Sequence, residues 1–283
     1  MQRKFIEEKV FIVLMQIATL LIVLSLVLIL ASILMKGLPA MSWAMVTEPP
    51  QGGYYMGKGG GILNAIVGSL YLAGGATIIA FIIGLPAVLY LNVYRKRKSK
   101  FASFTRLCLD VLWGIPSIVY GAFGFSVMTL IGLKVSLLAG MLTVGLLIIP
   151  IMIRAMDEVI RTTPQGLLDA SYALGATRFE TAFKVVIKQG MPGIVTAILI
   201  SFGRGVGDAA SVMFTAGYSD YVPESLTRPA ATLPLAIFFQ LGTPIKEVQQ
   251  RAYASALILT IIILLISLAT RFITRRYLKN KIQ

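Results

Sequence analysis

Long apolar runs separated by short clusters of charge dominate the pattern of hydrophobic and polar positions along this chain. A helix needs about 20 mostly apolar residues to cross the hydrocarbon core of a bilayer, where every backbone polar group must find a partner within the protein. Five stretches of 19 or more residues carry no Asp, Glu, Lys or Arg: residues 10–35, 59–94, 111–133, 135–153 and 252–270. They predict five membrane-spanning helices, the second of them over residues 65–91.

A sixth span is expected over residues 193–215, although Arg204 and Asp208 interrupt it. Without this span the two chain ends would lie on opposite sides of the membrane, and the asymmetry of the basic residues would be lost. The first apolar run is too long for the core of a cleaved signal peptide. The pattern therefore predicts an all-α integral membrane protein with six transmembrane helices in a single domain, residues 1–283.

Basic residues are distributed unevenly between the two sides of these spans. Nineteen of the 26 Lys and Arg residues lie in the N-terminal arm, the loops after the second and fourth spans, and the C-terminal tail. Such residues mark cytoplasmic segments, so both termini are predicted to be cytoplasmic. The expected cytoplasmic loop covers about residues 154–192, and the expected outer loops cover about 36–64 and 216–251.

Composition narrows the function further. Only 13% of the residues are charged, against about 25% in soluble proteins, so a soluble enzyme is excluded. The chain has no histidine and one cysteine, Cys108, which leaves no metal cluster, no internal disulfide and no convergent catalytic constellation. We expect no cofactor. The net charge of +14 reflects topology and contact with anionic membrane lipid, and needs no nucleic acid to explain it.

The cytoplasmic loop contains clear helix punctuation. The pair 163–164, Thr-Pro, is typical of a helix start, and Gly175 of a helix end. Residues 177–180 fit a capping box that opens a second helix. Gly190 and Pro192 are then expected to break the chain before the fifth span. A docking surface for a cytoplasmic partner and a loop that simply covers its own helix ends are both compatible with this pattern.

Within this loop, Asp169-Ala170-Ser171, followed by Gly175, resembles the EAA loop of ABC-importer permease subunits, which docks in a groove on the ATPase. Asp169 replaces the usual Glu, and Ser171 replaces the second Ala. Further segments resemble the permease subunits of high-affinity phosphate importers: residues 59–62, 115–121, 207–210, 214–216 and 229–234.

The resemblance implies a type I ABC-importer permease that translocates inorganic phosphate by alternating access in a prokaryotic cytoplasmic membrane. It also implies three kinds of protein partner: cytoplasmic ATPase subunits, a second permease subunit and an extracytoplasmic phosphate-binding protein. The chain lacks the Gly-x-x-x-x-Gly-Lys loop that binds ATP phosphates, so a partner must hydrolyse ATP. Docking is expected at Asp169, Ala170, Ser171 and Gly175. The alternatives are a permease for sulfate or molybdate and, from another class, an ion-gradient-driven carrier.

Charged residues inside the predicted spans are candidates for the substrate pathway. Arg204 costs about 2.5–3.5 kcal/mol near the bilayer midplane, so its presence calls for a reason. Four residues separate Arg204 from Asp208, which predicts that both lie on one helix face. A guanidinium matches phosphate oxygens bidentately, so the pair is interpreted as an anion site. The alternative is a structural ion pair that joins two helices.

A second candidate group lies at the cytoplasmic end of the fourth span. Arg154 has Asp157 and Glu158 in reach at i+3 and i+4. In the resembling family an arginine and an acid at this place are implicated in transport; the alternative is a surface ion pair.

Asp110 is predicted to stabilise the start of the third span through the helix dipole. Pro116 is expected to kink that span, and the short apolar segment 235–241 to lie on the outer surface or close the pathway there.

Overall fold

The computed structural model describes residues 2–52, 59–95 and 99–278. These residues are helical throughout, apart from connecting segments and one isolated bridge between Pro50 and Gly60. The elements are α1 Gln2–Gly37, η1 Leu38–Ala40, α2 Trp43–Thr47, α3 Leu63–Leu89, η3 Tyr90–Tyr94, α4 Lys100–Gly114, α5 Ser117–Leu130, α6 Leu137–Arg161, α7 Gln165–Ala173, α8 Arg178–Glu180, η4 Thr181–Val186, α9 Ile187–Val206, α10 Leu233–Leu241 and α11 Lys246–Leu278.

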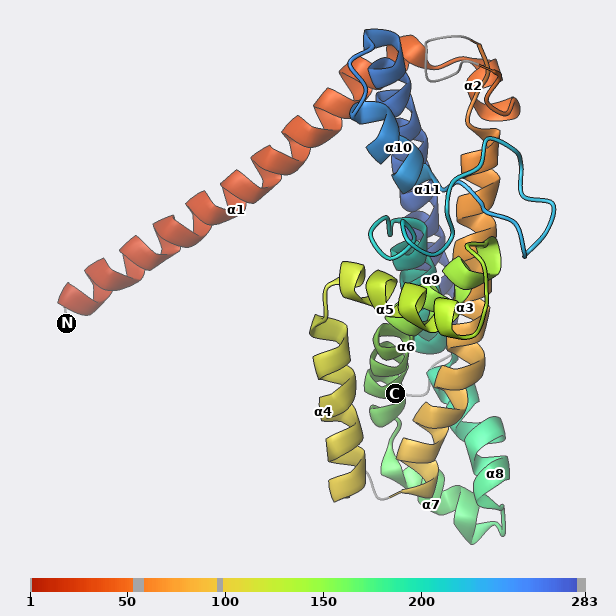
Figure 1. Ribbon diagram of the computed structural model, residues 1–283. Coiled ribbons are helices and arrows are strands. Elements are labelled where there is room, and N and C mark those ends of the chain that lie inside the picture. Colours follow the sequence, from red (N-terminus) through yellow and green to blue (C-terminus); the bar gives the residue numbers. More distant parts are fainter. Residues whose placement is uncertain (1, 53–58, 96–98, 279–283) are drawn as a thin grey trace.

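Helices α3, α6, α9 and α11 form the bundle, and α1 extends away from it after meeting α11 at one end (Figure 1). Small residues allow the central helices to approach closely, as is usual where lipid removes the hydrophobic drive for helix association. Gly205 of α9 packs against Ala73 of α3 and Val144 of α6, and Gly193 of α9 lies against Val159. The central core therefore lies between α3, α6 and α9.

The described residues contain five helices long and apolar enough to cross a membrane, or six if α4 and α5 together count as one broken span. This confirms the predicted all-α membrane fold. The side of the membrane on which each end lies remains a prediction from the basic residues. We call the two ends of the bundle the α7–α8 end and the α2–α10 end (Figure 1).

The third predicted span differs from its prediction. Instead of one kinked helix over 111–133, α4 begins at Lys100 and meets α5 at an angle of 98° around Pro116. Ser99 explains the earlier start, because its hydroxyl accepts a hydrogen bond from the Ala102 amide and caps α4. Asp110 therefore lies near the end of α4, and its predicted role at a helix start is wrong.

Two helix signals predicted in the segment 163–180 are confirmed, the end at Gly175 and the capping box; α7 begins at Gln165 with Pro164 as its N-cap residue, so Thr163 does not cap it. Gly175 follows α7 with φ +81°, and its amide donates to the Tyr172 carbonyl at 2.9 Å. Thr177 and Glu180 form the expected capping box. The predicted break at Gly190 and Pro192 is wrong: the chain stays helical from Arg178 to Val206.

The glycines near this point serve helix packing. A Cβ on Gly190 would press against Ile160 of α6, which shows how closely α9 approaches α6 there. Pro192 removes one amide from the helix, and neighbouring helices can accommodate such a loss inside a membrane bundle.

Helix α9 ends at Val206, within the length of its neighbours α3 and α6, and the chain then follows an irregular path to Thr232. Irregular backbone at membrane depth is tolerated only where protein or a water-filled cavity surrounds it. Here the start of α6 supplies amides: Ser136 donates to the Thr215 carbonyl at 3.0 Å, and Leu137 donates to the Arg228 carbonyl at 2.8 Å. These bonds attach the segment 207–232 to the start of α6, while its residues 224–229 stay exposed.

Candidate substrate pathway and ATPase-docking surface

A buried carboxylate joins three elements near the α7–α8 end. Asp157 of α6 has no exposed surface, and Arg106 of α4 binds its two oxygens at 2.8 and 3.0 Å. Asn92 of the π-helical turn η3 donates to the same carboxylate at 2.7 Å. Because a buried charge needs both a counter-charge and hydrogen bonds, this arrangement fixes η3, α4 and α6 relative to one another.

Arg154 lies beside this group with a more exposed partner. Its Nε donates to Asp110 at 2.6 Å, and its Nη1 is 3.4 Å from Asp157. The side chain of Arg154 is 22% exposed and that of Asp110 is 47% exposed, against 0% for Asp157. Arg154 is therefore the cation of this group that a solute could reach.

The structure brings together only part of the predicted set around Arg154. Asp157 lies within reach at i+3, as expected, but it is sealed from solvent, so in this conformation it can position Arg154 but cannot touch a solute. Glu158 is exposed, and no ion pair joins it to Arg154 in the part of the chain that is described.

Sequence reasoning misses Arg106 and Asn92 as members of this cluster, and it gives Asp110 a different role. Arg106 falls in a predicted cytoplasmic loop, since the apolar run that predicts the third span starts only at Val111. A usable signal exists: residues 100–114 have an amphipathic helical pattern, and Ser99 precedes them as a cap. A helix predicted there would place Arg106 and Asp110 on one element.

The predicted pair of Arg204 and Asp208 is corrected by the structure. The two residues do not share a helix face, because α9 ends at Val206 and Asp208 lies beyond Gly207 in the irregular segment. Asp208 is buried and accepts hydrogen bonds from the Ser211 amide, at 3.0 Å, and from the Ser211 hydroxyl. Arg204 is exposed, and no ion pair to Asp208 occurs among the described side chains.

Asp208 thus caps a turn, whereas Arg204 remains a cation within the depth of the bundle. The glycines on either side of it place it there: Gly203 faces Ile266 of α11, and Gly205 faces Ala73 of α3. Arg204 on α9 and Arg154 on α6 are consequently separate candidates for the substrate pathway. Asp208 is the counter-ion of neither.

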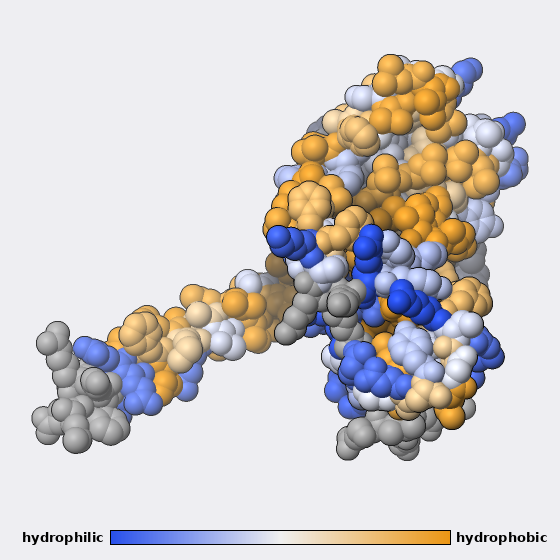
Figure 2. Space-filling view, turned by 90° about the horizontal axis from the view of Figure 1, so that it is seen from below, coloured by the Kyte–Doolittle hydropathy of each residue, from blue (hydrophilic) through white to orange (hydrophobic). Residues whose placement is uncertain are grey.

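The predicted docking residues lie together on the short helix α7 and its end. Asp169, Ala170 and Gly175 are exposed, and Ser171 is half-buried, with its hydroxyl 2.9 Å from that of Thr181 in η4. Leu174 at the end of α7 is 89% exposed. Figure 2 looks onto this end of the molecule and shows hydrophilic residues gathered there between apolar flanks. The surface is accessible for a partner.

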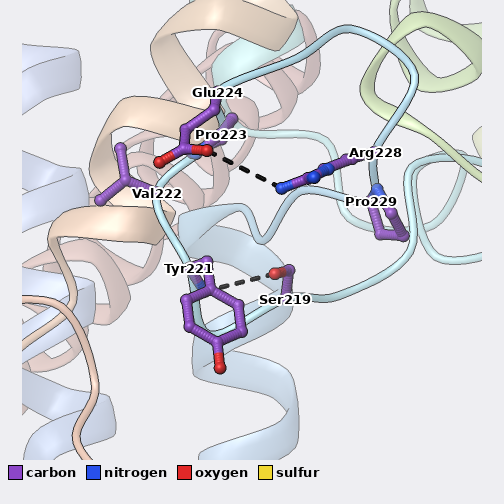
Figure 3. Close-up of a pocket in the computed structure, with 7 residues that line it drawn as sticks. All are labelled: Ser219, Tyr221, Val222, Pro223, Glu224, Arg228 and Pro229. Atoms are coloured by element: carbon purple, nitrogen blue, oxygen red, sulfur yellow. Dashed lines mark hydrogen bonds and ion pairs between the residues drawn. The ribbon is translucent and has the colours of Figure 1, made fainter.

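At the α2–α10 end, the segment 219–229 forms a pocket of about 220 Å³ (Figure 3). Arg228 and Glu224 approach to 3.7 Å across it, and the Tyr221 amide donates to the Ser219 hydroxyl. Both charged side chains are more than 70% exposed, so the pair is weakly held. The short segment 235–241 is part of α10, which packs on the bundle through Leu235 and Gln240 and exposes Phe238, Phe239 and Leu241, so both alternatives for this segment remain predictions.

Residues 76–281 match the family of binding-protein-dependent transport system inner membrane components. The fold agrees: the chain superposes on a chain of the MetNI methionine ABC transporter, in an inward-facing conformation, with a TM-score of 0.63 at 23% identity, covering 76% of this chain and 95% of the other. The fold and the family thus define an ABC-importer permease, a multi-pass protein of the cytoplasmic membrane that is not itself an enzyme.

Curated relatives narrow the family. The phosphate transport system permease protein PstA of Yersinia pestis is 36% identical over 247 residues, covering 87% of this chain and 82% of its own length. A probable PstA of Methanocaldococcus jannaschii is 32% identical over 95% of this chain and 94% of its own length. PstA 1 of Mycobacterium tuberculosis is 38% identical, over 77% of this chain and 72% of its own length. The chain belongs to this PstA family of permease proteins.

Proposed function

We propose that this chain is the transmembrane subunit of an ATP-driven importer that moves inorganic phosphate across the cytoplasmic membrane by alternating access. The observation that carries the proposal is the similarity, over 87% of the chain, to a relative named as a phosphate transport permease. The α7–α8 end faces the cytoplasm in this proposal, because the basic residues are concentrated in the segments at that end.

Arg154 and Arg204 supply the chemistry that a phosphate pathway requires. A guanidinium offers parallel N–H donors that match two oxygens of a phosphate group, and it keeps its charge at any physiological pH. Arg154 binds Asp110, whose half-exposed carboxylate can exchange with another anion. Arg204 is exposed and binds no carboxylate among the described residues. Both can therefore bind a passing anion without first breaking a buried ion pair.

The proposed function also implies the protein partners of this chain. Cytoplasmic ATPase subunits of the PstB type dock on Asp169, Ala170, Ser171 and Gly175, and their closure moves α7 relative to the bundle. A second permease subunit of the PstC type completes the pathway. Phosphate arrives at the α2–α10 end from an extracytoplasmic binding protein of the PstS type. The apolar surface of α1, none of whose span is buried, contacts membrane lipid or the second permease subunit.

The test is uptake of radiolabelled phosphate by vesicles that contain this chain with its partner subunits and the binding protein. ATP-dependent uptake that persists in excess sulfate is the expected result. Equal competition by sulfate or molybdate would favour the alternative of a permease for another oxyanion. Uptake indifferent to ATP would contradict the proposal and favour an ion-gradient-driven carrier.

A further inference from the structure

A small polar pocket lies between the bundle and the docking helix α7, and neither Arg154 nor Arg204 lines it. Its volume is about 210 Å³, which is below the range of pockets for drug-sized ligands and leaves room for a small group only. Two arginines line it, Arg95 after η3 and Arg178 at the start of α8, and none of its lining residues is Asp or Glu. The pocket therefore favours an anion.

Both guanidinium groups are held in place at the pocket wall. Arg95 Nε donates to the Tyr90 hydroxyl at 3.0 Å, and its guanidinium lies 5.4 Å from the ring centre of Phe101. Arg178 Nη1 donates to the Tyr94 carbonyl at 3.2 Å. A guanidinium has five N–H groups, so one hydrogen bond of this kind leaves several donors of each arginine for a ligand.

One of the lining residues, Asn92, carries a buried acceptor. Asn92 is 4% exposed, and its Oδ1 has no hydrogen-bond partner, whereas its Nδ2 is bonded to Asp157 and to the Val88 carbonyl. An unpartnered buried carbonyl oxygen costs about 1–3 kcal/mol, so a donor from a ligand would be stabilising there. The pocket thus combines donors for anionic oxygens with a lining residue, Asn92, whose buried acceptor is unpartnered.

We propose that this pocket binds a phosphate group, with Arg95 and Arg178 on its charged oxygens and Asn92 Oδ1 accepting from its P–OH. Inorganic phosphate keeps at least one protonated oxygen near neutral pH, whereas sulfate has none, so Asn92 discriminates between the two. The phosphodiester in the headgroup of an anionic lipid offers the same charged oxygens to the two arginines but carries no P–OH, so it would leave Asn92 Oδ1 without a partner.

The position of the pocket gives such binding a consequence, which rests on the proposed transport function. The ligand would bridge α8, which follows the docking helix, to η3, which holds Asp157 through Asn92. A bound phosphate would therefore stabilise the conformation seen here against movement of α7, and phosphate on the cytoplasmic side would slow its own import.

Binding is tested first, on the purified complex of this chain with its partner subunits in neutral detergent. Equilibrium dialysis measures the affinity for radiolabelled inorganic phosphate. Arg95→Gln and Arg178→Gln should each weaken binding by about tenfold, the equivalent of one charge-assisted hydrogen bond. Arg271→Gln is the matched control, since it removes the same charge from the exposed end of α11, and it should leave the affinity unchanged. Sulfate should compete poorly with phosphate.

Because Arg178→Gln also loses the bond to the Tyr94 carbonyl, Arg95→Gln is the second, independent variant. A lipid source is distinguished by reconstituting the complex into phosphatidylcholine vesicles with or without phosphatidylglycerol. If phosphatidylglycerol raises the thermal stability of the wild-type complex but of neither variant, a lipid phosphate occupies the pocket. Equal phosphate affinity in wild type and both variants, with no lipid effect, would overturn the proposal. Equal binding of sulfate would overturn the role of Asn92.

Regulation is then measured as the inhibition of ATP-driven uptake by phosphate placed on the cytoplasmic side of the membrane. We expect the inhibiting concentration to rise about tenfold in Arg95→Gln, and not in Arg271→Gln. Failure of the wild-type complex to take up phosphate would refute the proposed function, while the binding measurement would still decide the pocket.

Discussion

Arg106 and Asp157 form a two-pronged ion pair, with hydrogen bonds of 2.8 and 3.0 Å, between α4 and α6. Arg106 is 8% exposed and Asp157 is fully buried. Such a pair gains little over apolar packing, but the loss of one partner leaves an uncompensated charge in the interior. The pair therefore fixes the short helix α4 to α6 of the bundle.

Removing one partner of this ion pair should be strongly destabilising. We expect Arg106→Gln to lower the unfolding free energy by about 3–5 kcal/mol, because Asp157 then remains buried with the Asn92 hydrogen bond and only the longer, 3.4 Å contact to Arg154. Thermal unfolding of the purified complex measures the effect. The double variant Arg106→Gln with Asp157→Asn should recover part of the loss, since it leaves no buried charge. Strictly additive losses would contradict this account.

The neighbouring pair of Arg154 and Asp110 should behave differently. Asp110 is half exposed, so water can replace it on Arg154, and a pair of this kind contributes under about 1 kcal/mol to stability. Asp110→Asn should leave thermal stability nearly unchanged and retain phosphate uptake, whereas Arg154→Gln should assemble but lose uptake. Normal uptake by Arg154→Gln would exclude Arg154 from the pathway.

Close approach at Gly68 of α3 offers a test of the outer packing. A Cβ on Gly68 would overlap the backbone carbonyl of Ala231, in the irregular segment before α10, and a backbone atom cannot rotate aside. Gly68→Ala should therefore destabilise the protein by about 1–3 kcal/mol, as overpacking does. Gly74 lies on the same helix, and a Cβ added to it would meet nothing within 4 Å, which makes Gly74→Ala the matched control.

The expected result for Gly74→Ala is a neutral or slightly positive change, because alanine favours a helix over glycine by about 0.5–1 kcal/mol. Both values come from chemical denaturation or thermal melting of the purified complex. Equal effects of the two substitutions would show that α3 does not meet residue 231 as described.

Apolar runs and helix caps are sufficient to predict most of the helices, because both are local properties of the chain. The capping box at Thr177 and the end of α7 at Gly175 are examples. The failures arise where tertiary contacts decide: Pro192 is typical of a break, but packing against α6 carries the helix through it. Two partners of Asp157, Arg106 and Asn92, come from α4 and η3, and no sequence spacing could join them to it.

The same distinction explains the pathway residues. Arg154 and Asp157 can be paired from the sequence because they lie three residues apart on one helix. Arg204 and Asp208 satisfy a similar spacing, but α9 ends at Val206 between them, with Gly207 as its C-cap residue. Periodicity can place two side chains on a face only where the helix continues.

The capping box can be tested at the docking surface. Thr177→Ala removes the hydroxyl that accepts from the Glu180 amide at 3.2 Å, which should cost about 1 kcal/mol of local helix stability. Because α8 follows the docking helix directly, the loosened joint should reduce the amount of ATPase that copurifies with the permease. Thr177→Ser keeps the hydroxyl and serves as the control. Equal copurification of both variants would separate the cap from docking.

Arg204 is the last candidate to test, and the structure sharpens the design because Asp208 is not its counter-ion. Arg204→Ala should insert and assemble normally, since removal of an exposed arginine leaves no buried carboxylate unpaired, but it should lose phosphate uptake. Arg204→Lys keeps the charge without the planar fork, so partial uptake is expected if bidentate contact matters. Asp208→Asn should reduce stability through the Ser211 contacts instead of altering selectivity for the anion. ATP-driven uptake of phosphate and sulfate by the three variants separates these roles, and normal uptake by Arg204→Ala would remove α9 from the pathway.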